Sequence, residues 1–256
     1  MEWQERIKEK KGKEKIVMLT CYDFQMAKLL DEVGIDLILV GDSLGMVFQG
    51  LPDTKSVKMR DMIYHTKAVV RGAKNTPVIG DMPINSYTTP EIALKNAKKF
   101  QKAGAKGVKI EGNHPQVIKT LIKNKIPVMG HLGLLPQTAK KYKVRGKEKK
   151  EAEKILKDAK ELEKLGVFSV VLECVPEALA KKITESINIP TIGIGAGRYC
   201  DGQVLVINDL LGMDEKFKPK FVKKYLNLAK SIKRAVKKFK KEVKTGIFPS
   251  PEHTFH

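Results

Sequence analysis

The sequence predicts a single closed (β/α)8 barrel, and three observations lead to that fold class. Short runs rich in β-branched residues alternate with longer helical patterns, which is typical of a parallel sheet. The runs are apolar throughout, as in LILV at 37–40 and FSVVL at 168–172, so both faces of each strand are expected to be covered. Eight candidate strands within about 200 residues favour closure into a barrel, and a doubly wound open sheet is the alternative.

Each predicted strand is a short apolar run that ends at a glycine or a polar residue. The eight runs are Ile16–Thr20, Asp36–Val40, Pro77–Gly80, Gly107–Ile110, Ile126–Met129, Phe168–Leu172, Pro190–Ile194 and Val204–Ile207. The clearest predicted helices between them are Phe24–Val33, Met59–Arg71, Pro90–Ala103, Pro115–Lys123, Lys149–Leu165 and Pro176–Ser186. Several of these helices begin with proline and stop before glycine, as the unpaired groups at helix ends prefer.

The composition indicates a folded chain with one hydrophobic core. The 256 residues are 42% hydrophobic, and folds of this kind run to about 250 residues as one unit, so we expect one domain over residues 1–256. Residues 1–14 are expected to form a flexible or helical extension. We find neither an apolar run of the roughly 18 residues that a membrane span needs nor an apolar signal core. Three cysteines without metal spacing suit a reducing compartment, so we expect a cytoplasmic protein that binds no membrane.

Positive charge dominates the chain. It has 49 basic and 29 acidic residues, a net charge of +20, and six of the basic residues are arginines, which leaves 43 lysines. Proteins that read nucleic acids depend on arginine and on aromatic stacking, and this chain is poor in both. We therefore predict that it binds no nucleic acid.

Much of the charge lies in residues 216–244, which contain 12 lysines, one arginine and one glutamate. Apolar residues recur there at every third or fourth position, at Phe221, Tyr225, Leu228, Ile232, Val236, Phe239 and Val243. The spacing predicts one helix over 216–244 whose apolar stripe packs on the barrel or on a neighbouring subunit, with its lysines in solvent. An anionic membrane or nucleic-acid surface is the alternative partner of the lysine face.

Ionisable residues follow five consecutive predicted strands, always at the carboxyl end. In chain order they are Asp42, Asp81, Lys109 with Glu111, His131 and Glu173. The carboxyl ends of barrel strands meet at one mouth, where active sites lie. The sequence therefore predicts that these side chains share one site.

The carboxylates of this predicted site suggest a metal ion. Asp42, Asp81 and Glu111 lie on adjacent strands, and crowded carboxylates take up protons unless a cation neutralises them. A set of oxygen ligands with room for water suits Mg²⁺ better than zinc. We predict a metal role for the two aspartates and, through a water, for Glu111. Helix caps and surface ion pairs are the alternative roles.

The remaining ionisable residues suggest binding and proton transfer. Lys109 and Glu111 are two residues apart and so share a strand face; the lysine pairs with Glu111 or holds a substrate carboxylate. His131 is a polarising group or a hydrogen-bonded core histidine. Glu173, within the apolar sequence VVLECV, suits a general base, and a structural role at the turn before the next helix is the alternative.

Several blocks of the sequence resemble one enzyme family. They span roughly Lys15–His256 and include LTCYDFQMAKLLDEVGIDLILVGDSLGMVFQG, GDMPINSY, GVKIEG, PVMGHLGLLPQ, VVLECVP, IPTIGIGAGRYCDGQVLVINDLLG and FPSPEHTFH. Their order and spread are similar to the ketopantoate hydroxymethyltransferase family. The resemblance implies a (β/α)8 barrel related to phosphoenolpyruvate-utilising enzymes, with one Mg²⁺ per subunit and a homodecameric assembly.

The resemblance also implies a reaction and residue roles. The expected reaction moves a one-carbon unit from 5,10-methylenetetrahydrofolate to 3-methyl-2-oxobutanoate, giving 2-dehydropantoate for pantothenate and coenzyme A synthesis. Position by position, Asp42, Asp81 and Glu111 match the metal site, and Glu173 matches the proton acceptor. The two aspartates with Ser43, Lys109 and His131 are assigned to substrate binding. The alternative function is a metal-dependent lyase or mutase of the phosphoenolpyruvate-related barrels, which uses no folate.

Overall fold

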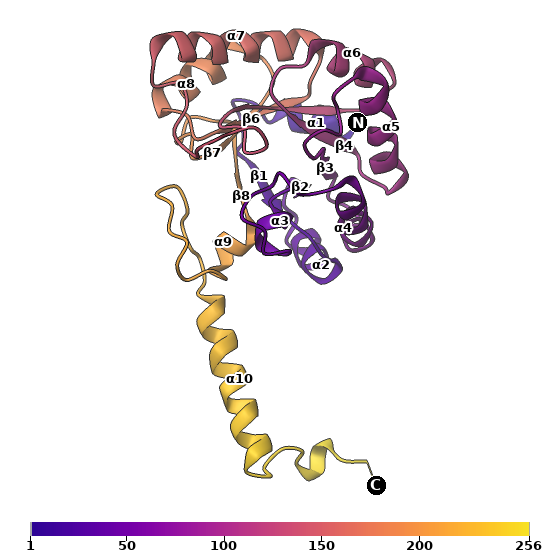
Figure 1. Ribbon diagram of the computed structural model, residues 1–256, viewed down its shortest axis with the longest axis vertical. Coiled ribbons are helices and arrows are strands. Elements are labelled where there is room, and N and C mark those ends of the chain that lie inside the picture. The colour runs from indigo at the N-terminus through magenta and orange to yellow at the C-terminus, as the bar shows by residue number, and fades with distance from the viewer. Residues whose placement is uncertain (1, 256) are drawn as a thin grey trace. The chain divides into compact units, whose positions relative to one another are not determined.

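The chain forms a closed barrel of parallel strands, as the sequence predicts. The computed structural model describes residues 2–255, and its strands pair in chain order from β1 to β8, with β8 closing on β1 (Figure 1). The strands are β1 Ile16–Thr20, β2 Leu37–Val40, β3 Val78–Asp81, β4 Gly107–Glu111, β5 Val128–Gly133, β6 Ser169–Glu173, β7 Thr191–Ile194 and β8 Gly202–Leu205. The open-sheet alternative is therefore excluded.

Helices surround the strands of the barrel (Figure 1). The larger ones are α2 Phe24–Val33, α4 Met59–Gly72, α5 Pro90–Lys102, α6 Pro115–Lys123, α7 Lys149–Leu165 and α8 Glu177–Ser186, with α1 Trp3–Glu9 before the first strand and the short α3 Leu44–Val47 after β2. Local chemistry explains their ends. The Asp23 carboxylate accepts a hydrogen bond from the Met26 main-chain N at the start of α2, and Gly34 ends that helix in the left-handed conformation, at φ 77°.

The eighth strand differs from its predicted range, Val204–Ile207. It occupies Gly202–Leu205, and Ile207 begins the short helix α9 (Ile207–Leu211). Gly202 lies so close to β1 that an added Cβ would be 2.5 Å from the Ile16 carbonyl oxygen. The absence of a side chain thus permits the strand contact that closes the barrel, a requirement that hydrophobic patterning does not reveal.

The first helix packs against the apolar cluster of the barrel. Ile7 of α1 is 4% exposed and belongs to that cluster, and Trp3 packs on it with an edge-to-face contact to Phe168 at 5.0 Å between ring centroids. The other buried members of the cluster are Ile16, Met18, Leu37, Leu39, Ile79, Met129, Phe168, Val171, Ile192 and Val204. Residues 1–14, expected to be flexible or helical, thus contribute a helix that joins the core.

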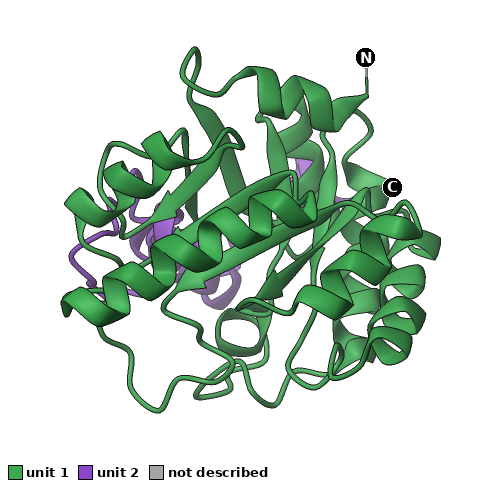
Figure 2. Ribbon diagram, turned by 90° about the horizontal axis from the view of Figure 1, so that it is seen from above, with its two compact units in different colours: residues 1–206 green, residues 207–256 purple. Residues whose placement is uncertain are grey.

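The chain divides into two compact units, which Figure 2 shows in different colours, although the sequence predicts one domain. The first unit, Met1–Val206, contains the whole barrel, and the second covers Ile207–His256. The second unit contains α9, the long helix α10 (Leu228–Lys244) and the short 3₁₀ helix η1 (Pro251–His253).

The predicted basic helix is shorter than expected and its stripe is not buried. Helix α10 begins at Leu228, so the prediction of one helix over 216–244 is wrong for its first twelve residues. Pro219 lies within that stretch. A proline inside a helix removes one main-chain hydrogen bond, and its ring clashes with the carbonyl of the preceding turn. No residue of α10 is buried, and its apolar side chains are 41–57% exposed at Ile232, Val236, Phe239 and Val243. The predicted partner of this stripe, the barrel or a neighbouring subunit, stays a prediction.

We expect Ile7→Ala to lower the free energy of unfolding by about 2–5 kcal/mol, because it removes buried methyl groups and leaves a cavity. The matched control is Ile92→Ala on α5, where the side chain is 41% exposed and the cost should stay within about 0.5 kcal/mol. Urea unfolding followed by circular dichroism measures both. Equal losses in the two variants would contradict the packing role of α1.

Candidate active site

The predicted site residues come together at the carboxyl ends of neighbouring strands. Asp42 follows β2, Asp81 ends β3, and Lys109 and Glu111 lie at the end of β4. His131 lies in β5 and Glu173 ends β6. All but Glu173 are at most 5% exposed, so the cluster combines charge with exclusion of water. The structure therefore brings together the ionisable residues that the sequence predicts to share one site.

The centre of the cluster is an ion pair between neighbouring strands. Lys109 Nζ donates to Asp81 Oδ1 at 2.7 Å, and the other oxygen of Asp81 accepts from the Asp42 main-chain N at 3.3 Å. From the sequence, we expected Lys109 either to pair with Glu111 or to hold a substrate carboxylate. Asp81 is its closest partner because β3 and β4 place these two residues in register, whereas residues two apart on one strand are separated by roughly 7 Å.

The geometry around His131 favours one tautomer. Lys109 Nζ lies 3.4 Å from His131 Nδ1, and an ammonium group can only donate, so Nδ1 accepts and the ring proton lies on Nε2. Nε2 is 3.2 Å from Glu173 Oε2, although the alignment is not that of a hydrogen bond. The imidazole therefore lies between the lysine and the carboxylate of Glu173.

Burial and mutual repulsion shift the titration of the cluster. Burial, followed by the charge of Asp81, raises the pKa of Asp42, and burial likewise raises the pKa of Glu111 well above its usual range. Burial alone would lower the pKa of Lys109, but the surrounding carboxylates, led by Asp81, outweigh it and raise that pKa. Burial and then Lys109 lower the pKa of His131, which favours the neutral ring. One lysine thus does not fully compensate the buried carboxylates.

The turn after Glu173 has an unusual backbone. Cys174 adopts a left-handed φ of 48°, and its carbonyl accepts a hydrogen bond from the Arg145 main-chain N at 2.8 Å. On the other side, Gly133 at φ 94° lies so close that an added Cβ would be 2.3 Å from the Glu173 carbonyl oxygen. These close contacts hold Glu173 at the edge of the site, where its side chain is 19% exposed.

Two further polar residues join the site from loops. Ser43, predicted to bind substrate, shares a 2.8 Å hydrogen bond with the Tyr22 hydroxyl. Gln137, which the sequence analysis did not single out, donates through Nε2 to Asp42 Oδ2 at 2.8 Å. Glutamine in a loop carries no pattern of its own; the only signal was its place within the block PVMGHLGLLPQ.

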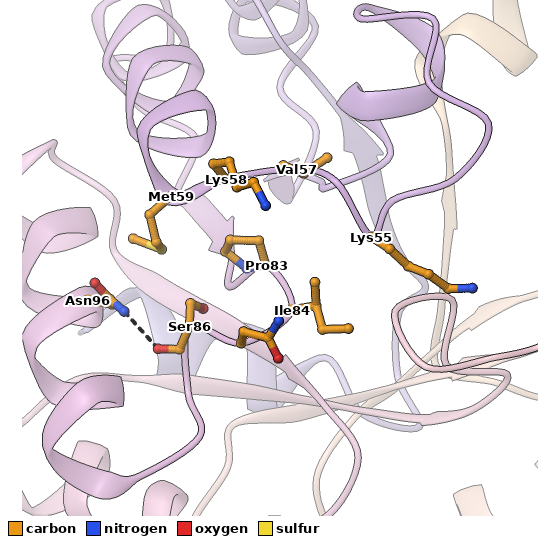
Figure 3. A pocket seen from close by; sticks show the side chains of 9 residues that line it. Lys55, Val57, Lys58, Met59, Pro83, Ile84, Ser86 and Asn96 are labelled. Atoms are coloured by element: carbon orange, nitrogen blue, oxygen red, sulfur yellow. Dashed lines mark hydrogen bonds between the residues drawn. The ribbon is translucent and has the colours of Figure 1, made fainter.

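A small pocket of about 210 Å³ lies between the loop that precedes α4 and the loop that follows β3 (Figure 3). Lys58 points toward Pro83 in this view, whereas the ammonium group of Lys55 points away from the other labelled side chains. The Ser86 carbonyl accepts a hydrogen bond from Asn96, and the buried Ser86 hydroxyl has no partner among residues 2–255. None of the predicted site residues lines this pocket.

The oxygen atoms of the cluster fit a hard cation that keeps other ligands. Among residues 2–255, no group of three or more acidic, histidine or cysteine side chains is arranged to hold a metal ion by itself. The Asp42 main-chain N nevertheless donates to the Asp81 carboxylate, and burial, followed by the negative charge of Asp81, raises the pKa of Asp42. A cation would neutralise that charge. Mg²⁺ is commonly held by one or two carboxylates, with water and substrate as the other ligands. The residues present therefore fit Mg²⁺ in that form.

We expect Lys109→Met, studied in EDTA, to lower the free energy of unfolding by about 3–5 kcal/mol at pH 8, because it leaves buried carboxylates uncompensated. The loss should be smaller at pH 5. Asp42 and Glu111 have raised pKa values in the folded protein. Above about pH 4 the folded protein therefore keeps protons on these groups that the unfolded chain has released, and the free energy of unfolding falls as the pH rises. Removing the lysine raises these pKa values further. Urea unfolding at both pH values measures the difference, and an equal loss at both would contradict this charge balance.

A sequence model of a known family matches nearly the whole chain. The family described as ketopantoate hydroxymethyltransferase matches residues 2–251. Among residues 2–255, no helix has the length and apolar character to cross a membrane.

Curated relatives named 3-methyl-2-oxobutanoate hydroxymethyltransferase are similar along their full length. The protein of Clostridium botulinum is 57% identical over 249 residues, covering 94% of this chain and 90% of the relative. Those of Syntrophus aciditrophicus and Caldicellulosiruptor saccharolyticus are 54% and 55% identical, covering 96% and 97% of this chain and 93% and 96% of the relatives.

Solved structures of other enzymes share the fold. Phosphonopyruvate hydrolase matches with a TM-score of 0.65 at 12% identity, over 100% of this chain and 92% of that chain. A 2,3-dimethylmalate lyase of the PEP mutase/isocitrate lyase superfamily matches with a TM-score of 0.63 at 13% identity, also over 100% and 92%. At these identities the likeness concerns the barrel fold alone.

Proposed function

The chain belongs to the ketopantoate hydroxymethyltransferase family, and we propose that the buried cluster at its barrel mouth is the active site of that transferase. The proposed reaction joins a one-carbon unit to C3 of 3-methyl-2-oxobutanoate and gives 2-dehydropantoate. The proposed donor is 5,10-methylenetetrahydrofolate, with water supplying the hydroxyl oxygen. The observation that carries the proposal is the position of Glu173, at the edge of a buried cluster whose single lysine is outnumbered by carboxylates.

Asp42 and Asp81 would hold one Mg²⁺, with Glu111 acting through a water. When bound, the ion would offset the carboxylate charge and stabilise negative charge on the keto oxygen of the substrate. The effect of the Asp81 charge on Asp42, which with burial raises the pKa of Asp42, supports this role. A 2-oxo acid carries its own carboxylate and keto oxygens, which would complete a set of oxygen ligands.

Lys109 would bind the negative charge that develops on the substrate. It is buried and its pKa is raised, so it stays charged throughout the working range of pH. A fixed positive charge in a dry site stabilises an enolate oxygen more strongly than the same charge would in water. Ser43, held by the Tyr22 hydroxyl, would donate to or accept from the substrate.

Glu173 would accept the C3 proton of the substrate. Its side chain is partly exposed, so it can meet a substrate that enters from the mouth. His131 would act as a positioning residue, because its neutral ring lies between Lys109 Nζ, 3.4 Å from Nδ1, and Glu173 Oε2, 3.2 Å from Nε2. Loss of the proton leaves an enolate carbon that attacks the one-carbon unit. The bonds from that unit to the folate nitrogens break, water supplies the hydroxyl oxygen, and tetrahydrofolate leaves.

Glu173→Gln should keep the shape of the side chain but remove the proton acceptor. Exchange of the substrate C3 proton with deuterated solvent should fall by about 10²–10⁴-fold, while binding of the 2-oxo acid persists. NMR of the substrate in D₂O measures exchange, and Glu185→Gln on α8, where the side chain is 64% exposed, is the matched control. Exchange at the wild-type rate in Glu173→Gln would remove Glu173 from the base role. Loss of substrate binding would instead favour a structural role at the turn.

Removal of divalent cations with EDTA should abolish formation of 2-dehydropantoate from 3-methyl-2-oxobutanoate and methylenetetrahydrofolate, and Mg²⁺ should restore it. Asp81→Asn should weaken Mg²⁺ binding and turnover together, because it removes a charge from the proposed ligand set. Asp158→Asn on α7, whose carboxylate meets only a surface lysine and an asparagine, is the control. Full turnover after exhaustive metal removal would contradict the metal role.

A further inference from the structure

We propose that Gln137 is a positioning residue for the cation site, holding the carboxylates of Asp42 and Glu111 in the orientation that binds the ion. The inference rests on the metal role proposed above for these carboxylates. It concerns a residue outside the predicted ligand set, on the loop that follows β5.

Gln137 joins two of these carboxylates through hydrogen bonds of its own. Its side-chain nitrogen Nε2 donates to Asp42 Oδ2 at 2.8 Å and to the Met82 carbonyl at 2.9 Å. Its main-chain N donates to Glu111 Oε2 at 3.1 Å. Residues 42 and 82 follow β2 and β3, and residue 111 ends β4, so a single loop residue ties the ends of these three strands together.

The orientation of the Gln137 amide is set by its partners. The Tyr87 hydroxyl donates to Oε1 at 2.6 Å, and both partners of Nε2 are acceptors. A flipped amide would direct its oxygen at a carboxylate and a carbonyl, so only one arrangement satisfies all these groups. Gln137 is fully buried, and water therefore cannot replace a lost bond without rearrangement.

These bonds control the direction of each carboxylate. Gln137 donates to one carboxylate oxygen of Asp42 and to one of Glu111. A donor fixed at one oxygen sets the rotation of the carboxylate, and so the direction in which its second oxygen points. A neutral donor also stabilises the ionised carboxylate without adding a positive charge that would compete with the cation. Lys109 acts differently, because its charge compensates Asp81 directly. Outer partners of this kind orient metal ligands in many proteins.

The test compares Mg²⁺ affinity in the full-length protein by isothermal titration calorimetry, at equal folded fraction by circular dichroism. Gln137→Met is similar in length but cannot donate, and Mg²⁺ affinity should fall about 10–100-fold. Saturating Mg²⁺ should restore much of kcat, while the KM for the 2-oxo acid stays raised. Tyr87→Phe removes the hydroxyl that orients the amide and keeps the Gln137 donor, so Mg²⁺ affinity should fall in the same direction by a smaller factor. Gln101→Met, at an exposed position of α5, should bind Mg²⁺ as wild type does.

The outcomes separate the possible failures. A folded Gln137→Met with wild-type Mg²⁺ affinity overturns the positioning role, even if its melting temperature falls. Should that variant not fold, Tyr87→Phe with unchanged affinity overturns it. Wild-type protein that binds no Mg²⁺ overturns the cation site and this proposal with it. Wild-type binding with unaltered variants overturns only the part assigned to Gln137.

Discussion

The buried ion pair between Lys109 and Asp81 is the interaction on which the site depends. Charges removed from water are costly, and only close pairing with further hydrogen bonds makes their burial tolerable. The 2.7 Å contact meets that requirement for Asp81 but leaves the charges of Asp42 and Glu111 only partly compensated. A site in this condition favours a ligand that brings positive charge, as a divalent cation does.

The barrel makes this arrangement possible through register. Asp81 pairs with Lys109 across β3 and β4, and Glu111 pairs with His131 across β4 and β5. Each of these contacts follows from the alignment of parallel strands and does not depend on a flexible loop. The rigid part of the site is therefore the charge cluster, held by the same backbone ladder that forms the core.

Loops supply the groups that orient this cluster. Tyr87 and Gln137 come from the loops after β3 and β5, and Cys174 turns the chain directly after Glu173. Their hydrogen bonds cross between elements that are far apart in sequence. The division is physically sensible, because strands fix where the charges lie, while loop residues set the direction of individual oxygen atoms.

The sequence by itself determined the fold class, the helix and strand order, and the gathering of Asp42, Asp81, Lys109, Glu111, His131 and Glu173 at one mouth. These features depend on local periodicity and on the rule that parallel barrel strands end on one side, and both can be read from residues close together in the chain. The ligand roles of these residues remain proposals. The tertiary structure decided which charges pair, the start of β8 at Gly202 and of α10 at Leu228, the exposure of the α10 stripe, and the place of Gln137. Such facts depend on contacts between residues distant in sequence, and side-chain type or spacing along one segment carries no information about them.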